Sequence, residues 1–337
     1  MSGCATAPAR PADRYLVALR YDVEPVLAEH GPEPGMDIVR HDLARAAELG
    51  FNCVLLGHVD ERDVAGLLDA AAEVGLSLAV PSRSGAYFVR TGCGGNGPAG
   101  RTNLAGAMPR AVTAHAAFAA MVVERGADEE SAQRSRRLAA TLERRGVACA
   151  VWGRKDQTEG LATIRVGDAG ASDTQGWLAQ FHAGLAAGLT DGVVIDRYRA
   201  TPGDPPGLAS RDGSISPARV AALGEVLTRG LRWGRRLIRA RAAPISQTPP
   251  PAEGDVMLVL LSQGRRSYVL VFNPATEGYL RREVGMPETV PGGRFHRAVE
   301  VPPSASRLAG RVVDARAGQL LLPVDLRPGD AALFELF

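Results

Sequence analysis

The chain has 337 residues, of which 45% are hydrophobic and 23% charged, and its formal net charge is only +2. This balance excludes a disordered chain and a small disulfide-bonded module. No apolar run reaches the ~18 residues that a membrane-spanning helix needs. The basic residues are nearly all arginine, Lys155 being the only lysine, in a chain rich in alanine and glycine. This bias does not indicate a nucleic-acid partner.

The four cysteines do not form a disulfide framework in a chain of this length. Cys53 and Cys149 lie in apolar runs and are predicted to be core. Cys4 follows Met1, Ser2 and Gly3 and resembles the lipidated cysteine that ends a bacterial lipoprotein signal, with residues 5–12 as a tether. This interpretation predicts a periplasmic or extracellular protein held at a membrane by a lipid on Cys4, with its signal beginning upstream. A chance cysteine in a disordered N-terminus is the alternative.

From residue 15 onward, apolar periodicity switches between strand-like and helix-like patterns. The first predicted strands are residues 15–21, 51–56 and 76–80, and the first helices are 36–49 and 62–74, closed by Gly50 and Gly75. After a glycine-rich loop at 82–110 come strands at 116–123, 147–152, 161–166 and 193–195, with helices at 128–145, 174–187 and 217–241. This alternation predicts a parallel sheet covered by helices. Only about ten residues separate the fifth and sixth strands, too few for a helical crossover, so one βα unit is missing or degenerate.

Residues 243–254 are rich in proline and mark the clearest boundary. Beyond them all signals are β, at 256–262, 267–272, 279–284, 298–301, 310–315, 319–324 and 331–337. The predicted organisation is an N-terminal tether at 1–13, a mixed α/β domain at 14–242, the linker, and a small β-sandwich at 255–337.

Residues 92–97 match the GxGxxG pattern, but no buried strand runs into them and Pro98 spoils the following helix. The histidines are scattered without ligand spacing. The sequence therefore predicts neither a cofactor nor a metal site.

Three segments carry a family resemblance. In residues 37–56, an aspartate-leucine pair lies in a predicted helix, and glycine-phenylalanine-asparagine then leads into a predicted strand. In residues 70–81, a second helix ends at glycine-leucine before the next strand. Residues 166–172 with Gln175 and Trp177, and residues 188–199 with 212–214, follow the pattern of two later strands and their exits. Together with the β-rich tail they resemble clan A glycoside hydrolases of the β-galactosidase-like families.

The resemblance implies a (β/α)8 TIM barrel, complete or lacking one unit, with its site at the carboxyl ends of the strands. It implies an enzyme that hydrolyses glycosidic bonds of a poly- or oligosaccharide with two carboxyl groups. Glu124 would be the acid/base and Asp168 the nucleophile or general base.

Both positions depart from the family pattern. Val123 replaces the asparagine before the acid/base, and Asp168 is one methylene shorter than the usual glutamate. Because inverting enzymes separate their carboxyls by ~6.5–9.5 Å and retaining ones by ~5–5.5 Å, the short side chain favours inversion or loss of catalysis. Alternatively, Glu124 pairs with an arginine and Asp168 caps a turn.

Other polar and aromatic residues at predicted strand ends would line the same mouth as substrate contacts: Asp22, His58, Arg83, Trp152, Arg154, Lys155, Asp196 and Tyr198. Trp152 or Tyr198 would stack on a pyranose or belong to the core.

The carboxyl-terminal half of the predicted helix at 217–241 carries a run of six arginines beside its apolar stripe, at positions 229, 232, 235, 236, 239 and 241. Their usual meaning is a solvated face; docking of an acidic polysaccharide or of the β domain is the alternative.

Three functions remain open on the sequence. The first is a glycoside hydrolase and the second a catalytically inactive barrel that binds glycan or a protein partner in a polysaccharide assembly. The third is an unrelated α/β protein with a β appendage. The sequence does not indicate an oligomeric state.

Overall fold

The computed structural model describes residues 15–57, 59, 61–81, 115–124, 133, 137, 140, 141, 144, 149–152, 163–167, 174–199, 207–245, 256–275, 277–303 and 310–337. They form two compact units that alternate along the chain. Unit 1 comprises residues up to 162 together with 194–214, and unit 2 comprises 163–193 together with 215–337.

Unit 1 is built on a parallel sheet with strand order β5-β4-β3-β2-β1-β7. Its strands are β1 (Leu16–Tyr21), β2 (Cys53–Leu56), β3 (Ser77–Pro81), β4 (Phe118–Glu124), β5 (Cys149–Trp152) and the second half of β7 (Gly192–Ile195). Each predicted strand is present, with bounds shifted by at most two residues. The α/β class predicted for this part of the chain is thus confirmed, as a parallel sheet with helices.

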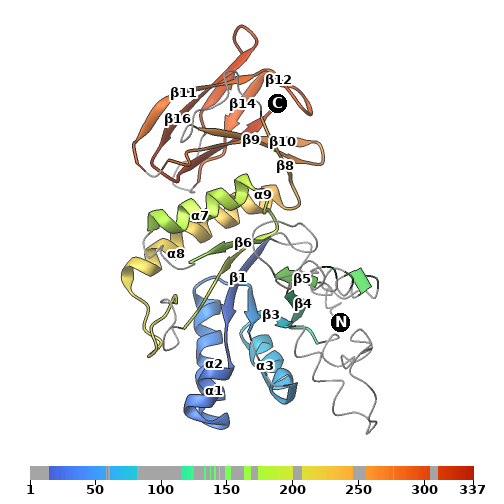
Figure 1. The fold of residues 1–337 in the computed structure, drawn as a ribbon, viewed down its shortest axis with the longest axis vertical. Coiled ribbons are helices and arrows are strands. Elements are labelled where there is room, and N and C mark those ends of the chain that lie inside the picture. Colours follow the sequence, from blue (N-terminus) through green and yellow to red (C-terminus); the bar gives the residue numbers. More distant parts are fainter. Residues whose placement is uncertain are drawn as a thin grey trace, which may run out of the picture. The chain divides into compact units, whose positions relative to one another are not determined.

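The helices that accompany this sheet include α1 (Glu24–His30), α2 (Pro32–Glu48) and α3 (Glu61–Glu73) (Figure 1). The sequence analysis missed α1 and began α2 four residues late. Gly31 separates the two helices at a φ of 84°, which only glycine adopts easily, and a proline follows it as the first residue of α2. Gly31 and Pro32, which interrupt the apolar period, therefore mark the boundary between the two helices.

Side-chain alternation divides the sheet of unit 1 into two faces. One face carries a core of mostly small side chains: Leu16, Ala18, Cys53, Leu55, Ala79, Ala119 and Val194. The opposite face carries Val17 and Leu19, which are also fully buried. Both faces of the parallel strands are thus covered, as continuous apolar runs predict.

Unit 2 begins with β6 (Thr163–Val166), on which α7 (Thr174–Ala186) packs. Next in this unit comes α8 (Pro217–Arg229), continued by a single π-helical segment, Gly230–Gly234, and a last short turn, α9 (Arg235–Leu237). Figure 1 shows α7 and α8 side by side. The predicted helix at 217–241 is therefore wrong at its end, because residues 241–244 form a strand, β8 (Arg241–Pro244).

The antiparallel part of unit 2 has one sheet of order β15-β14-β17-β10-β9-β8 and a facing two-stranded sheet, β11-β16. Its long strands are β9 (Met257–Gln263), β10 (Arg266–Phe272), β11 (Leu280–Pro287), β14 (Arg297–Glu300), β15 (Val312–Asp314), β16 (Gln319–Leu326) and β17 (Ala331–Leu336). Two short strands, β12 (Thr289–Val290) and β13 (Gly293–Arg294), form a further hairpin that the sequence analysis missed. Apolar side chains of both layers share one core, which confirms a separate antiparallel region.

Arg229 ties the helices of unit 2 to its strands. Its Nη1 donates to Asp330 Oδ1 at 2.7 Å, and its side chain is only 11% exposed. His182 of α7 is fully buried beside it, with Nδ1 2.9 Å from the carbonyl oxygen of Gly329. Of the two interpretations of the arginine run, contact with the β region therefore holds for Arg229, and a solvated face does not.

Gly329 provides the first prediction. Its φ is +70°, and an added Cβ would lie 2.4 Å from Ala179 Cβ in α7. We expect Gly329→Ala to lower the free energy of unfolding by about 3 kcal/mol, because a left-handed backbone and an overpacked contact are both unfavourable. Gly318→Ala is the control, since Gly318 has a φ of +77° but open space around it, and should lose only about 1 kcal/mol. Urea denaturation measures both, and equal losses would contradict the contact.

A second prediction concerns the buried imidazole of His182. Burial, with a smaller contribution from the positive charge of Arg229, lowers the pKa of His182 to about 4. In the unfolded chain this pKa is about 6.5, so between these values the unfolded chain binds a proton that the folded chain does not. Stability should therefore fall as the pH decreases from about 6.5 to 4, by at most about 3 kcal/mol. His182→Gln should remove this part of the pH dependence of the urea midpoint.

Candidate functional site

Two carboxylates meet one guanidinium where β1 and β7 end. Asp22 follows β1, and its Oδ1 lies 3.6 Å from Arg20 Nε. Asp196 follows β7, and its Oδ1 lies 3.9 Å from Arg20 Nη1. The three side chains are between 16% and 30% exposed, so solvent reaches them. We call Arg20, Asp22 and Asp196 the strand-end site.

The alternation of β1 explains this meeting. Arg20 and Asp22 are in phase with Leu16 and Ala18, and Asp196 is in phase with Val194, all of the small-residue core. The strand-end site therefore continues the core face of the sheet to its carboxyl edge, where parallel α/β sheets place their ligands.

Gly57 makes room for Asp22 at the end of β2. A Cβ added to Gly57 would lie 1.7 Å from Asp22 Oδ1, and the Gly57 N–H donates to the carbonyl of Tyr21 at 2.8 Å. The ends of β1, β2 and β7 thus come together at one point, and glycine is required there because the carboxylate occupies the side-chain position.

The opposite face of β1 leads to a buried charged network. Tyr21 donates its hydroxyl to Asp42 Oδ2 at 2.6 Å, and Asp42, on α2, is 2% exposed. Arg199 binds both carboxylate oxygens of Asp42, with Nε at 2.5 Å and Nη2 at 2.7 Å, and donates a further hydrogen bond to the Arg211 carbonyl at 2.7 Å. This bidentate pair fixes the segment that follows Asp196.

The tyrosines of this network are held neutral. Burial first, and then the negative charge of Asp42, raise the pKa of Tyr21, and burial raises the pKa of Tyr198 to about 12. The hydrogen bonds to Asp42 raise the pKa of Arg199. The bidentate pair of Asp42 and Arg199 thus lies beside two neutral phenol rings and holds α2 to the segment after β7.

The structure places the predicted site residues as follows. Asp22 and Asp196 come together, while the ring of Tyr198 is 1% exposed and packs on Tyr21 at 5.6 Å between centroids. Glu124 and Trp152 are the last residues of β4 and β5 and are partners in register. The remaining predicted residues lie outside the described part of the chain: Cys4, His58, Arg83, Arg154, Lys155 and Asp168.

Sequence reasoning missed Arg20, Gly57 and Asp42. The signal for Arg20 was a single charge inside an apolar strand, in phase with the following aspartate. There was no such signal for Asp42, because an aspartate in a helix is usually solvated and its partner, Arg199, is 157 residues away.

Chemically, the strand-end site offers two carboxylate acceptors and one guanidinium donor. Among the described residues, no three histidine, cysteine, aspartate or glutamate side chains are grouped so that they would hold a metal ion. Within the same residues, no helix is long and apolar enough to cross a bilayer.

The buried pair yields a third prediction. Asp42→Ala should lower the free energy of unfolding by about 3–5 kcal/mol, because the Arg199 charge would stay buried without its partner. The double variant Asp42→Leu with Arg199→Leu should lose much less than the sum of the two single losses. Asp37→Ala, which removes an exposed pair with Arg40, is the control and should change stability by less than about 1 kcal/mol. Additive losses in urea denaturation would contradict the coupling.

Comparison with known proteins gives a likeness of fold. No family model matches the sequence, and no curated protein is significantly similar to it. Among solved structures, a maltogenic α-amylase from Thermotoga neapolitana is 8% identical, with a TM-score of 0.51 over 95% of this chain and 98% of that one. An α-fucosidase from Thermotoga maritima is 10% identical, with a TM-score of 0.49 over 98% and 97%. A family 5 glycoside hydrolase from Bacteroides vulgatus is 9% identical, with a TM-score of 0.48 over 96% and 89%. The likeness to the amylase, with a TM-score above 0.5, shows a similar fold.

Proposed function

We propose that this protein is a glycoside hydrolase that cleaves a poly- or oligosaccharide with two carboxyl groups. The observation that carries the proposal is the strand-end site, in which β1 and β7 bring Asp22 and Asp196 to one guanidinium. It lies at the edge where enzymes with parallel α/β sheets bind substrate. The fold likeness to the amylase supports the same class of protein.

In this proposal Glu124 is the acid/base. It is the last residue of β4, and the register pairs Ala79 with Ala120, from which position 124 is four residues along the strand. The register of β4 with β3 shifts between Leu78 and Ala79, and Ala119 belongs to the same small-residue core as Ala79. The support for Glu124 is therefore its place at the carboxyl end of β4, the edge that carries the strand-end site.

Asp168 is the proposed nucleophile or general base, one residue beyond a fixed point of the backbone. Gly167 has a φ of +91°, donates its N–H to Gln180 Oε1 at 2.8 Å, and lies against the Trp177 ring. The chain thus leaves β6 in a direction set by α7. A short aspartate at this position favours a water-mediated inversion.

Asp22, Asp196 and Arg20 would then bind the sugar rather than break its bond. Two carboxylates and a guanidinium accept and donate hydrogen bonds to neighbouring hydroxyls, and their partial exposure leaves them accessible.

The fourth prediction tests the chemistry. Glu124→Gln and Asp168→Asn should each reduce the rate of glycan hydrolysis by at least about a thousandfold, since each removes an ionisable group from the reacting pair. Reducing-end release from a panel of oligo- and polysaccharides between pH ~4 and ~8 measures this, because the proposed mechanism needs one carboxyl protonated and the other ionised.

Two matched variants control for the substitutions themselves. Glu73→Gln and Asp37→Asn change exposed carboxylates on α3 and α2 and should keep full activity. Hydrolysis retained in both Glu124→Gln and Asp168→Asn would remove these assignments. Glycan binding without turnover by the unmodified chain would favour an inactive binding barrel.

A further inference from the structure

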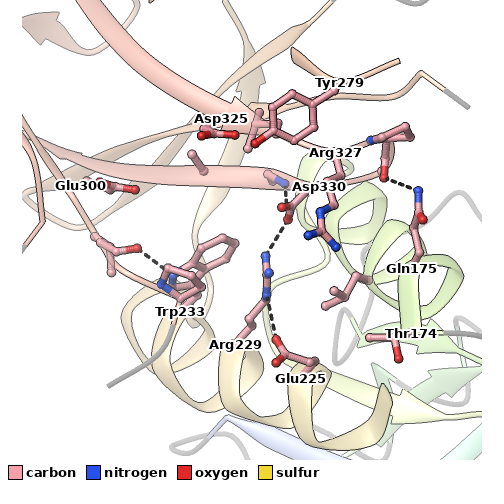
Figure 2. Close-up of a pocket in the computed structure, with 18 of the residues that line it drawn as sticks. Thr174, Gln175, Glu225, Arg229, Trp233, Tyr279, Glu300, Asp325, Arg327 and Asp330 are labelled. Carbon is pink, nitrogen blue, oxygen red and sulfur yellow. Dashed lines mark hydrogen bonds and ion pairs between the residues drawn. The ribbon is translucent and has the colours of Figure 1, made fainter. Parts of the chain in front are cut away.

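Unit 2 holds a cavity of about 910 Å³ that contains no residue of the strand-end site. Its walls come from α7, from α8 with the following π-helical segment, and from the strands and the turn around β16 and β17. Figure 2 shows Tyr279, Asp325 and Arg327 on one side of it, and Arg229 and Glu225 on the other. Its volume lies within the range of small-ligand sites.

The walls of the cavity are fixed before any ligand arrives. Arg229 Nη1 donates to Asp330 Oδ1 at 2.7 Å, and Gln175 Nε2 donates to the Pro328 carbonyl at 3.2 Å. Trp233 Nε1 donates to the Val301 carbonyl at 3.1 Å, and the Trp233 side chain is fully buried. A cavity held open by such contacts binds with little ordering of its own groups.

The charges around the cavity nearly cancel. Arg229 is paired with Asp330, and Arg311 binds Glu300 with Nε at 2.8 Å from Oε2. The lining as a whole has four carboxylates and three guanidinium groups. A phosphate or a polyanion would meet several of these carboxylates, so the balance favours a ligand that is polar but uncharged.

Tyr279 gives the cavity an apolar surface. Its side chain is 60% exposed, and it immediately precedes β11, where Leu280 pairs with Leu326. Continuing this register places Tyr279 opposite Arg327, two residues from Asp325 on β16. An exposed ring flanked by a carboxylate and a guanidinium matches a pyranose, whose C–H face is apolar and whose edge carries hydroxyls.

We propose that this cavity binds a short neutral oligosaccharide, with Tyr279 stacking on a sugar ring and Asp325 and Arg327 contacting its hydroxyls. The proposed role of this cavity is binding without catalysis, and it does not depend on the hydrolysis proposed above. Its residues come from unit 2 alone, so it would give the protein a second point of attachment to a glycan.

The test is isothermal titration calorimetry of the full chain carrying Asp168→Asn, so that a bound sugar is not consumed. The probes are maltotriose, cellotriose, xylotriose and chitotriose, up to about 10 mM, where binding weaker than the millimolar range goes undetected. We expect at least one probe to bind, and Tyr279→Ala and Asp325→Asn each to weaken that binding roughly tenfold.

Phe337→Ala is the matched control, because Phe337 is 58% exposed and is not part of the cavity. It should leave the affinity unchanged. Failure of all four probes to bind, or an affinity that Tyr279→Ala and Asp325→Asn leave intact, would overturn the inference. Tighter binding of a uronic acid trimer than of every neutral probe would also overturn it, since the ligand would then be an anion.

These outcomes are separable from those for catalysis. If hydrolysis depends on Glu124 but the Tyr279→Ala variant binds the probe normally, only the proposal for the cavity is contradicted. If probe binding depends on Tyr279 but the unmodified chain hydrolyses no glycan, only the proposal of a glycoside hydrolase is contradicted.

Discussion

The two-residue alternation of β1 decides which charged groups of unit 1 meet. Arg20 points with the small-residue core toward Asp22 and Asp196, and Tyr21, one residue later, points the other way to Asp42. One strand therefore supplies a solvent-accessible polar site on one face and a buried structural network on the other. A shift of one residue in its register would exchange the two faces and bury the wrong groups.

The two units use ion pairs that are largely shielded from solvent in a similar way. Asp42 and Arg199 join segments 157 residues apart, and Arg229 and Asp330 join segments 101 residues apart. Such pairs contribute little net stability, because removing charges from water offsets most of their attraction. Their strict geometry instead selects one arrangement of helix and strand among several with similar apolar burial.

Local signals predicted most of the elements, because strands and helices of this chain have clear apolar periods and end at glycines such as Gly50 and Gly75. The helix that was expected to reach residue 241 shows where such signals fail. Nothing local stops it at Leu237, and residues 241–244 become a strand only because β9 is there to pair with them. The candidate site divides in the same way: Asp22 and Asp196 were predicted from strand ends, whereas Arg20 and Gly57 gain their roles from partners on other strands.

The alternation of the two units along the chain has a consequence for dissecting the protein. The polypeptide passes from one unit to the other three times, at residues 162/163, 193/194 and 214/215. No single cut therefore releases an intact unit. A fragment that starts within the proline-rich segment would lose β8 from the edge of its sheet, and Asp330 would lose its guanidinium partner. Limited proteolysis in that segment would accordingly yield pieces that stay associated, rather than two modules that separate and survive alone.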